Sequence, residues 1–437
     1  MTDVRPLNRW LVHSRRLLVI ALILAFAVLA VRAVFDLWMG RRLNDEIARL
    51  EKQYGPLKWD PVRKLDAWKK WPRRIAPDNR ARMIDAAAAR VTLSDAYENL
   101  LYLPHVPSTM TADQVAGIAD ENRDAVQLAI RAARLRHSNW DIAYLAEPSN
   151  VPNLMDLQNL SRVLAIAARS DTDAGRADEA VADLTAGFAE SAAMRTEPLA
   201  IMVITATAVA REQIDALKDV LSRAEPSSAA LAALAVAIDE NLLEHPIREV
   251  MLGELKRSRF IWPRIEAGYF DGWSNSYPRP KWMRGAAWLV RPVIRFMAMR
   301  DLAEKARAVD AASMPRSRRT EIAPSSPPAG EINEGAAPVQ NFVKAGDLSN
   351  ASIGLAATAV ALRRFRLDHG TYPNTLDELA PMYMKTVPLE PFTGRPPEYV
   401  RQGAGFELHA RVPVQPVPPG AVKISDASSP WEWKMPR

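Results

Sequence analysis

The sequence of 437 residues contains no cysteine and six histidines. The missing thiols exclude disulfide bonds, cysteine-thiolate catalysis, and zinc or iron–sulfur sites held by cysteine. None of the histidines belongs to a His-Glu-x-x-His helix or another metal-ligand spacing. The sequence also lacks a Gly-x-Ser-x-Gly elbow, a phosphate-binding glycine loop and a dinucleotide fingerprint. We therefore expect no metal, no cofactor and no catalytic site of these classes.

Long apolar runs are equally scarce, and one stretch alone is long enough to cross a bilayer. The run Leu17–Val31 is uninterrupted, and the helical pattern continues to Met39. A helix over 17–39 covers about 30 Å of hydrocarbon. The second apolar run, Pro198–Ala210, is too short and is typical of a buried core helix.

Polar and aromatic residues mark the ends of this predicted span. Arg32 and Asp36 are four residues apart, so we expect them to pair on one face near an interface. Trp10 and Trp38 are expected near opposite headgroup layers.

Positive charge favours one orientation of the span. Residues 1–16 contain Arg5, Arg9, Arg15 and Arg16, which predicts a cytoplasmic N-terminus, an inner-membrane location and a periplasmic body. Arg41 and Arg42 on the other side weaken this prediction. The alternative is a signal peptide cleaved after small residues such as Val28 and Ala30.

The net charge of +6 is unevenly distributed. Residues 1–80 and 252–320 each carry a net charge of about +9, and the remainder is acidic. Two basic zones on an acidic body favour an anionic surface near those zones, such as a membrane.

A basic and aromatic juxtamembrane segment is predicted over 40–77. Its first part continues the helix of the span. Later, Val62, Leu65 and Trp68 lie on one helical face, surrounded by the basic residues Arg63, Lys64, Lys69 and Lys70. Trp59, Trp68 and Trp71 are candidate membrane or partner contacts. Two interpretations stay open: a short helix lying on anionic lipid, or a linker whose tryptophans pack on the soluble domain.

Residues 78–311 are rich in alanine and leucine and predict a mainly α-helical body. The unit Leu160–Met194 reads as helix, polar turn with Gly175, and helix. We expect Ala180, Leu184 and Phe188 to face Val163, Ile166 and Ala167. This spacing resembles a tetratricopeptide unit, although no second copy follows at the same period.

Aromatic and basic residues alternate between 260 and 296. Membrane or partner contact, structural packing, and single-stranded nucleic-acid binding are the possible roles; the periplasmic location disfavours the last. The candidate contact residues in this segment are Trp262, Trp273, Trp282, Trp288, Arg284, Arg291 and Arg295.

The end of the chain predicts a linker over 312–345, a small α+β module over 346–415 and a tail over 416–437. The module begins with a helix, Ser349–His369, that is apolar nearly all round and should be buried. A capping box, Thr375–Glu378, opens a short helix, and Glu398–Val412 alternates as a β-hairpin.

This order of elements resembles the periplasmic part of the major pseudopilins of type II secretion. The residues on the family's pattern are Tyr372, Pro373, Leu376, Leu379, Val387, Pro388, Pro391, Gly394, Tyr399 and Phe406. The resemblance implies a docking or closing module. The pseudopilin calcium loop does not carry over, because the chain after Phe406 is poor in acidic residues. The whole layout also resembles bacterial single-pass membrane proteins, which implies no particular activity.

Two functions of different classes follow. The first is a non-catalytic, membrane-anchored envelope scaffold or interaction subunit with a protein partner, and with neither nucleic acid nor a small-molecule substrate. The alternative is an envelope hydrolase with dispersed residues near His245–Glu249, where the simpler interpretation is a helix start.

Overall fold

The computed structural model describes residues 5–57, 78–93, 110–140, 142, 151–197, 199–242, 246–266, 282–314, 336–411 and 432–435. Two compact units are present. The anchor unit comprises Met1–Trp59 and Leu255–Ala306. The body unit comprises Asp60–Glu254 and Arg307–Arg437. Residues 255–306, expected in the helical body, thus belong to the same unit as the apolar N-terminal helix.

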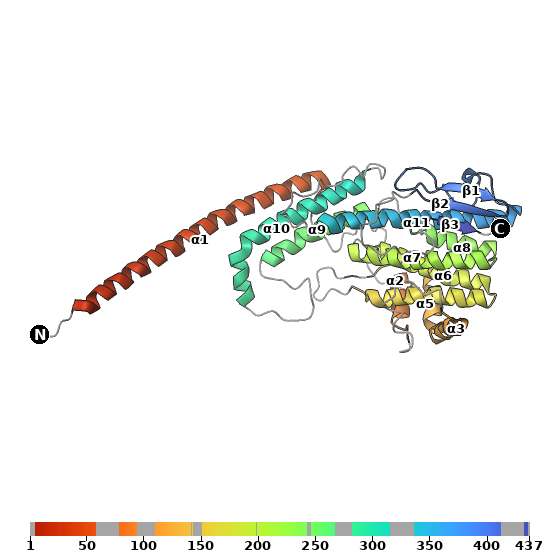
Figure 1. The fold of residues 1–437 in the computed structure, drawn as a ribbon, viewed down its shortest axis with the longest axis horizontal. Helices are drawn as coiled ribbons and strands as arrows, with labels where there is room; N and C mark the ends of the chain where they lie inside the picture. The colour runs from red at the N-terminus through yellow and green to blue at the C-terminus, as the bar shows by residue number, and fades with distance from the viewer. Residues whose placement is uncertain are drawn as a thin grey trace, which may run out of the picture. The chain divides into compact units, whose positions relative to one another are not determined.

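The anchor unit contains the long helix α1, Arg5–Tyr54, which is red in Figure 1. Its other helices belong to α9, Pro246–Glu266, and α10, Trp282–Ser313, and the division between the units falls inside both. The predicted continuation of the apolar helix beyond residue 39 is confirmed. Beyond the apolar stretch, Met39, Ile47 and Leu50 of α1 are buried.

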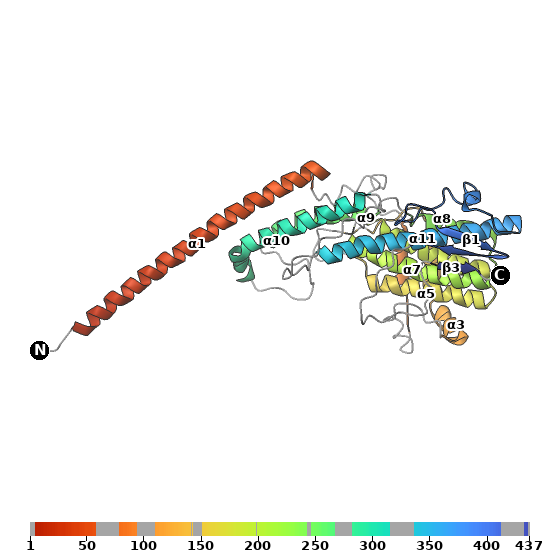
Figure 2. The same cartoon turned by 45° about the horizontal axis from the view of Figure 1, so that its top comes forward.

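The body unit is an array of helices around two cores. Its helices before α9 are α2 (Arg80–Ala88), α3 (Ala112–Glu121), α4 (Arg123–Ala133), α5 (Leu154–Asp173), α6 (Ala177–Arg195), α7 (Ala200–Arg223) and α8 (Ser228–Asp239). Figure 1 and Figure 2 show α5 and α7 side by side, with α11 over α7 and α8. The prediction of a mainly helical body is confirmed.

The predicted hairpin over 160–194 is present as α5 and α6. Gly175 turns the chain between them with φ +75°, a conformation that glycine adopts without strain. The predicted facing residues do not share one core, however. Ala180, Leu184 and Phe188 pack in the core that includes α8 and α11, which we call the C-terminal core.

Residues Val163, Ile166 and Ala167 instead pack with α2 and α4 in a second core, the N-terminal core. The expectation failed because α6 is buried on nearly every side, so its two faces serve different cores. The hairpin alone therefore does not make a self-contained layer.

The predicted buried helix near residue 350 is confirmed as part of α11, Ala336–His369. Every residue from 349 to 363 is buried, as an apolar surface all round the helix requires. The helix begins at Ala336, inside the predicted linker, so that linker boundary was wrong. Gly370 ends the helix with φ +73°.

The C-terminal module contains the predicted short elements. The turn η4, Leu376–Leu379, is a 3-10 helix, and the Glu378 carboxylate accepts hydrogen bonds from the N–H groups of Asn374 and Thr375. Strands β1, Glu398–Gln402, and β2, Gly405–His409, form the predicted antiparallel hairpin.

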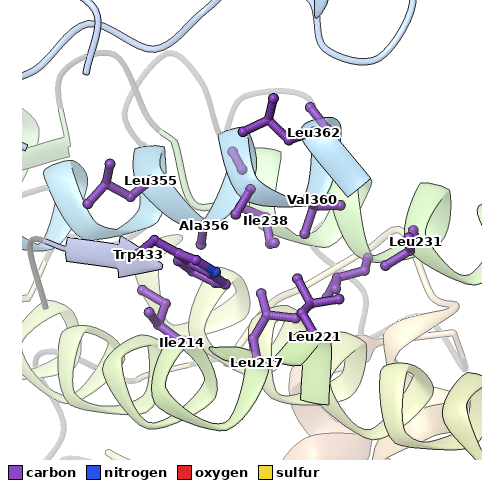
Figure 3. Packing of buried hydrophobic residues seen from close by; sticks show 14 of the residues in the cluster. Ile214, Leu217, Leu221, Leu231, Ile238, Leu355, Ala356, Val360, Leu362 and Trp433 are labelled. Atoms are coloured by element: carbon purple, nitrogen blue, oxygen red, sulfur yellow. The ribbon is translucent and has the colours of Figure 1, made fainter. Parts of the chain in front are cut away.

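A third strand was not predicted. β3, Glu432–Met435, pairs antiparallel with β2 and gives the sheet order β1-β2-β3. Its Trp433 is 1% exposed. Figure 3 shows this ring between Leu355 and Ala356 of α11 and Ile214 of α7. The predicted C-terminal tail, 416–437, thus supplies a large side chain to the C-terminal core.

Candidate membrane-facing site

The apolar stretch Leu17–Val31 of α1 is exposed on all sides. From Leu17 to Trp38 the large apolar side chains are exposed, up to 74% for Phe26. Within the ranges that the structure describes, α1 is the one helix long and apolar enough to cross a membrane, and its most apolar window has no buried part. A helix that is apolar all round needs an apolar environment, which here no described part of the protein supplies.

Four charged side chains from three helices converge beside residue 36. Asp36 Oδ1 lies 3.2 Å from Arg295 Nη1, and Asp36 Oδ2 lies 3.9 Å from Arg291 Nη1. Glu266, the last residue of α9, lies 2.9 Å from Arg291 Nε and 2.7 Å from Arg295 Nη2. These side chains are between 15% and 36% exposed, so water screens them less than a surface pair. We call this group the Asp36 cluster.

The expected pairing of Arg32 with Asp36 is replaced by contacts with α10. The Arg32 guanidinium lies 3.6 Å from the centroid of the Trp288 ring and donates to the Trp288 carbonyl oxygen. A guanidinium over an indole face gains electrostatic attraction without another ion. Both polar residues of the predicted span therefore find their partners on α10.

Gly40 makes room for the Asp36 cluster. A Cβ at this position would lie 2.6 Å from Arg295 Nη1. The same nitrogen donates to the Asp36 carbonyl oxygen at 2.8 Å. The sequence carried a signal for this contact, because an isolated glycine inside a helical pattern often marks close packing. Its partner, more than 250 residues away, could not be read from the sequence.

A second polar network joins α9 to α10. Trp262 Nε1 donates to Asp301 Oδ2 at 2.7 Å, and Lys305 Nζ lies 3.0 Å from Asp301 Oδ1. Lys305 also donates to Ser258. Trp262, a candidate contact residue, thus has its indole N–H satisfied inside the protein.

Among the other candidate contact residues, the side chain of Trp38 is described and the remaining side chains are not. Trp38 is 46% exposed, stacks on Phe35 with ring centroids 5.8 Å apart, and has the Arg42 guanidinium 4.5 Å from its ring centroid. For Trp10, Trp282 and Arg284 the helix is described but the side chain is not, and four tryptophans lie outside the described residues: Trp59, Trp68, Trp71 and Trp273.

A groove of about 390 Å³ opens on the body unit between α4, α6 and α8. Its lining is mostly alanine and valine, including Val181 and Val236. The ion pair between Arg80 and Glu240 is also part of the lining. Val236 is 62% exposed although it is apolar.

Ionisable groups are also buried inside the body unit. Burial raises the pKa of Glu190 well above its usual value, and neither carboxylate oxygen has a hydrogen-bond partner. Burial lowers the pKa of Arg195 to about 10, and its Nη2 donates to Ser349 Oγ at 2.8 Å. Desolvation also raises the pKa of Asp183. None of these three side chains lines the groove.

The region of the alternative enzymatic hypothesis is only partly described. His245 lies outside the described residues, and Glu249 Oε1 is 2.9 Å from Arg248 Nη1 in an ion pair at the surface. Among the described residues, no group of three or more histidine and carboxylate side chains is arranged to hold a metal ion.

In comparisons with known proteins, no protein-family model, curated protein or solved structure matches the chain.

Proposed function

We propose that this chain is a non-catalytic scaffold or interaction subunit of the bacterial envelope, held in the inner membrane by α1. In this proposal residues 1–16 are cytoplasmic and the body unit is periplasmic. The observation that carries it is the uncovered apolar surface between Leu17 and Trp38, which only lipid would cover. The Asp36 cluster supports a retained anchor, because it fixes the end of that surface to α9 and α10.

The groove of the body unit is the proposed contact surface for a protein partner. An apolar floor of alanine and valine with charges at its margin suits an amphipathic helix, whose apolar side enters the groove and whose polar side stays wet. Arg134 and Asp178 at the groove offer charges of both signs to such a helix. The proposed occupant is an amphipathic helix of another envelope protein.

Two resemblances narrow the class of partner. The α5–α6 hairpin is similar to a tetratricopeptide unit, a class of structure that binds peptides and helices. The helix, short turn and hairpin at the C-terminus follow the order found in major pseudopilins. A secretion-related membrane complex is therefore the proposed setting, with the C-terminal module as a docking or closing element.

Single cysteines test the proposed topology directly, because the chain has none of its own. Met155 on α5 is 47% exposed, so Met155→Cys should react with a membrane-impermeant maleimide once the outer membrane is permeabilised. Thr2→Cys should react only after the inner membrane is broken. Labelling of both positions only after full lysis would refute the periplasmic body, and release of Met155→Cys protein from membranes would refute the anchor.

Purification from gently solubilised membranes tests the interaction. Val236→Arg places a charge in the groove and should reduce co-purifying subunits by about tenfold, equivalent to about 1.4 kcal/mol. Ile204→Arg is the matched control, since Ile204 is 49% exposed on α7 and does not line the groove. Equal losses from both variants, or a wild-type chain that purifies alone, would contradict the proposed role of the groove.

A further inference from the structure

The exposed face of α10 changes character along its length. On this face the large apolar side chains, exposed by between 46% and 54%, are Val290, Val293, Phe296 and Met297. On the same face, two turns beyond Val293, the exposed residue is Arg300. A row of this kind on a water-facing helix loses hydrophobic stabilisation at every member. The face therefore favours an apolar environment up to Met297 and water from Arg300 onward.

Side-chain contacts fix the register between α10 and α1. Arg32 meets Trp288, Asp36 meets Arg295, and the Tyr54 hydroxyl donates to the Ala306 carbonyl oxygen at 3.0 Å. The partners are 252 to 259 positions apart along the whole contact. The two helices therefore run parallel, and each level of α10 can be assigned to a level of α1.

In this register both helices change from apolar to charged at the same level. The exposed surface of α1 is apolar up to Trp38 and charged at Arg41 and Arg42. The corresponding change on α10 lies between Met297 and Arg300. Two independent helices that change character in one plane indicate a single boundary between lipid and water.

The two charged residues of α1 on the apolar side of this boundary, Arg32 and Asp36, both contact side chains of α10. Arg32 lies on the ring of Trp288, and Asp36 lies against Arg291 and Arg295. Ionisable side chains inside a bilayer are costly unless another charge or a ring faces them. Without α10, the apolar stretch Leu17–Val31 alone is short for a bilayer. With α10, the span extends past Arg32 and Asp36.

We propose that α10, from Met297 back to Val290, enters the membrane leaflet beside α1, with lipid acyl chains as the occupant of its exposed face. The inference rests on the proposed function, because α1 must span the bilayer. From Met297 to Val290 the rise of about 1.5 Å per residue gives a depth of about 10 Å, within the headgroup and upper acyl region. Pro292 lies inside the helix, and α10 bends in its N-terminal half in Figure 1, as a helical proline causes.

Fluorescence quenching of the full chain in vesicles of phosphatidylcholine and phosphatidylglycerol tests the proposal. One cysteine at a time carries an environment-sensitive dye at Leu24, Val293 or Arg300, at a low ratio of protein to lipid. Nitroxide-labelled lipid should quench the dye strongly at Leu24 and Val293 and weakly at Arg300. Aqueous iodide should give the reverse order. Met297→Cys replaces Val293→Cys if the latter protein does not fold.

The outcomes separate the two proposals. A dye at Val293 that iodide quenches, with Leu24 protected, overturns the insertion of α10 and leaves the anchor standing. A dye at Leu24 that iodide quenches overturns both. A dye at Val293 that neither reagent reaches shows that protein, such as a second copy of the chain, covers this face, and it also overturns the lipid contact.

Discussion

Replacement of the buried carboxyl Glu190 by glutamine should make the body unit more stable than the wild type, by a margin that grows as the pH rises. Glu190 is 0% exposed, and neither oxygen has a hydrogen-bond partner. Burial raises the pKa of this carboxyl well above its ordinary 4.5. The folded chain therefore keeps the proton in a pH range in which the unfolded chain has released it. Glutamine keeps the shape and the neutral charge and has no proton to lose.

The size of the effect follows from linkage. Above pH 4.5 the unfolded chain binds one proton fewer than the folded chain, so the free energy of unfolding falls by about 1.4 kcal/mol per pH unit until the raised pKa is reached. Within that window, Glu190→Gln should gain about 1.4 kcal/mol over the wild type for each pH unit. For a unit of about 330 residues this corresponds to a difference of about 2 °C in Tm per pH unit.

Thermal unfolding of both proteins, followed by helical circular dichroism between pH 5 and pH 7, measures this difference. The control is Glu121→Gln, because Glu121 ends α3 in the same body unit and is exposed. Effects from Asp183, whose pKa is also raised, are common to both proteins and cancel. A constant difference between Glu190→Gln and the wild type across this range would refute the argument.

Three further substitutions test close packing. Gly40→Ala places a Cβ 2.6 Å from Arg295 Nη1, and Gly187→Ala places one 2.2 Å from Gln213 Cδ; each should lower the free energy of unfolding by about 1–3 kcal/mol. Denaturant unfolding measures both, and an unchanged midpoint would mean that the neighbour moves aside freely. Trp433→Ala should cost about 3–5 kcal/mol by thermal unfolding, whereas a loss below 1 kcal/mol would show that β3 is dispensable.

Elements with local signals could be predicted from the sequence. Gly175 set the turn between α5 and α6, the capping box at Thr375 set η4, and Gly403, with φ +59°, set the hairpin turn. Each depends on residues a few positions apart, whose conformational preferences do not need the rest of the fold. The burial of α11 was predictable for a similar reason, because a helix that is apolar all round is either buried in a protein core or spans a membrane.

Contacts between segments far apart in the chain could not be predicted from the sequence. β3 has only four residues, too few for a strand pattern, and it depends on pairing with β2. The partners of Asp36 lie some 255 residues along the chain, so the nearby Arg32 was the natural but wrong choice. The start of α11 at Ala336 was missed because proline and glycine nearby favour a linker.

The enclosure of α11 has a consequence for biosynthesis. Leu217 and Leu234, in α7 and α8, belong to the core that residues such as Val360 and Leu362 complete. About 120 residues separate the end of α8 from Leu362, which a ribosome translates in roughly 6–24 s at 5–20 residues per second. During that interval the apolar side chains of α7 and α8 lack their packing partners on α11. A chain that ends before α11 would therefore lack the residues that complete this core, and its α7 and α8 would keep apolar side chains in contact with water.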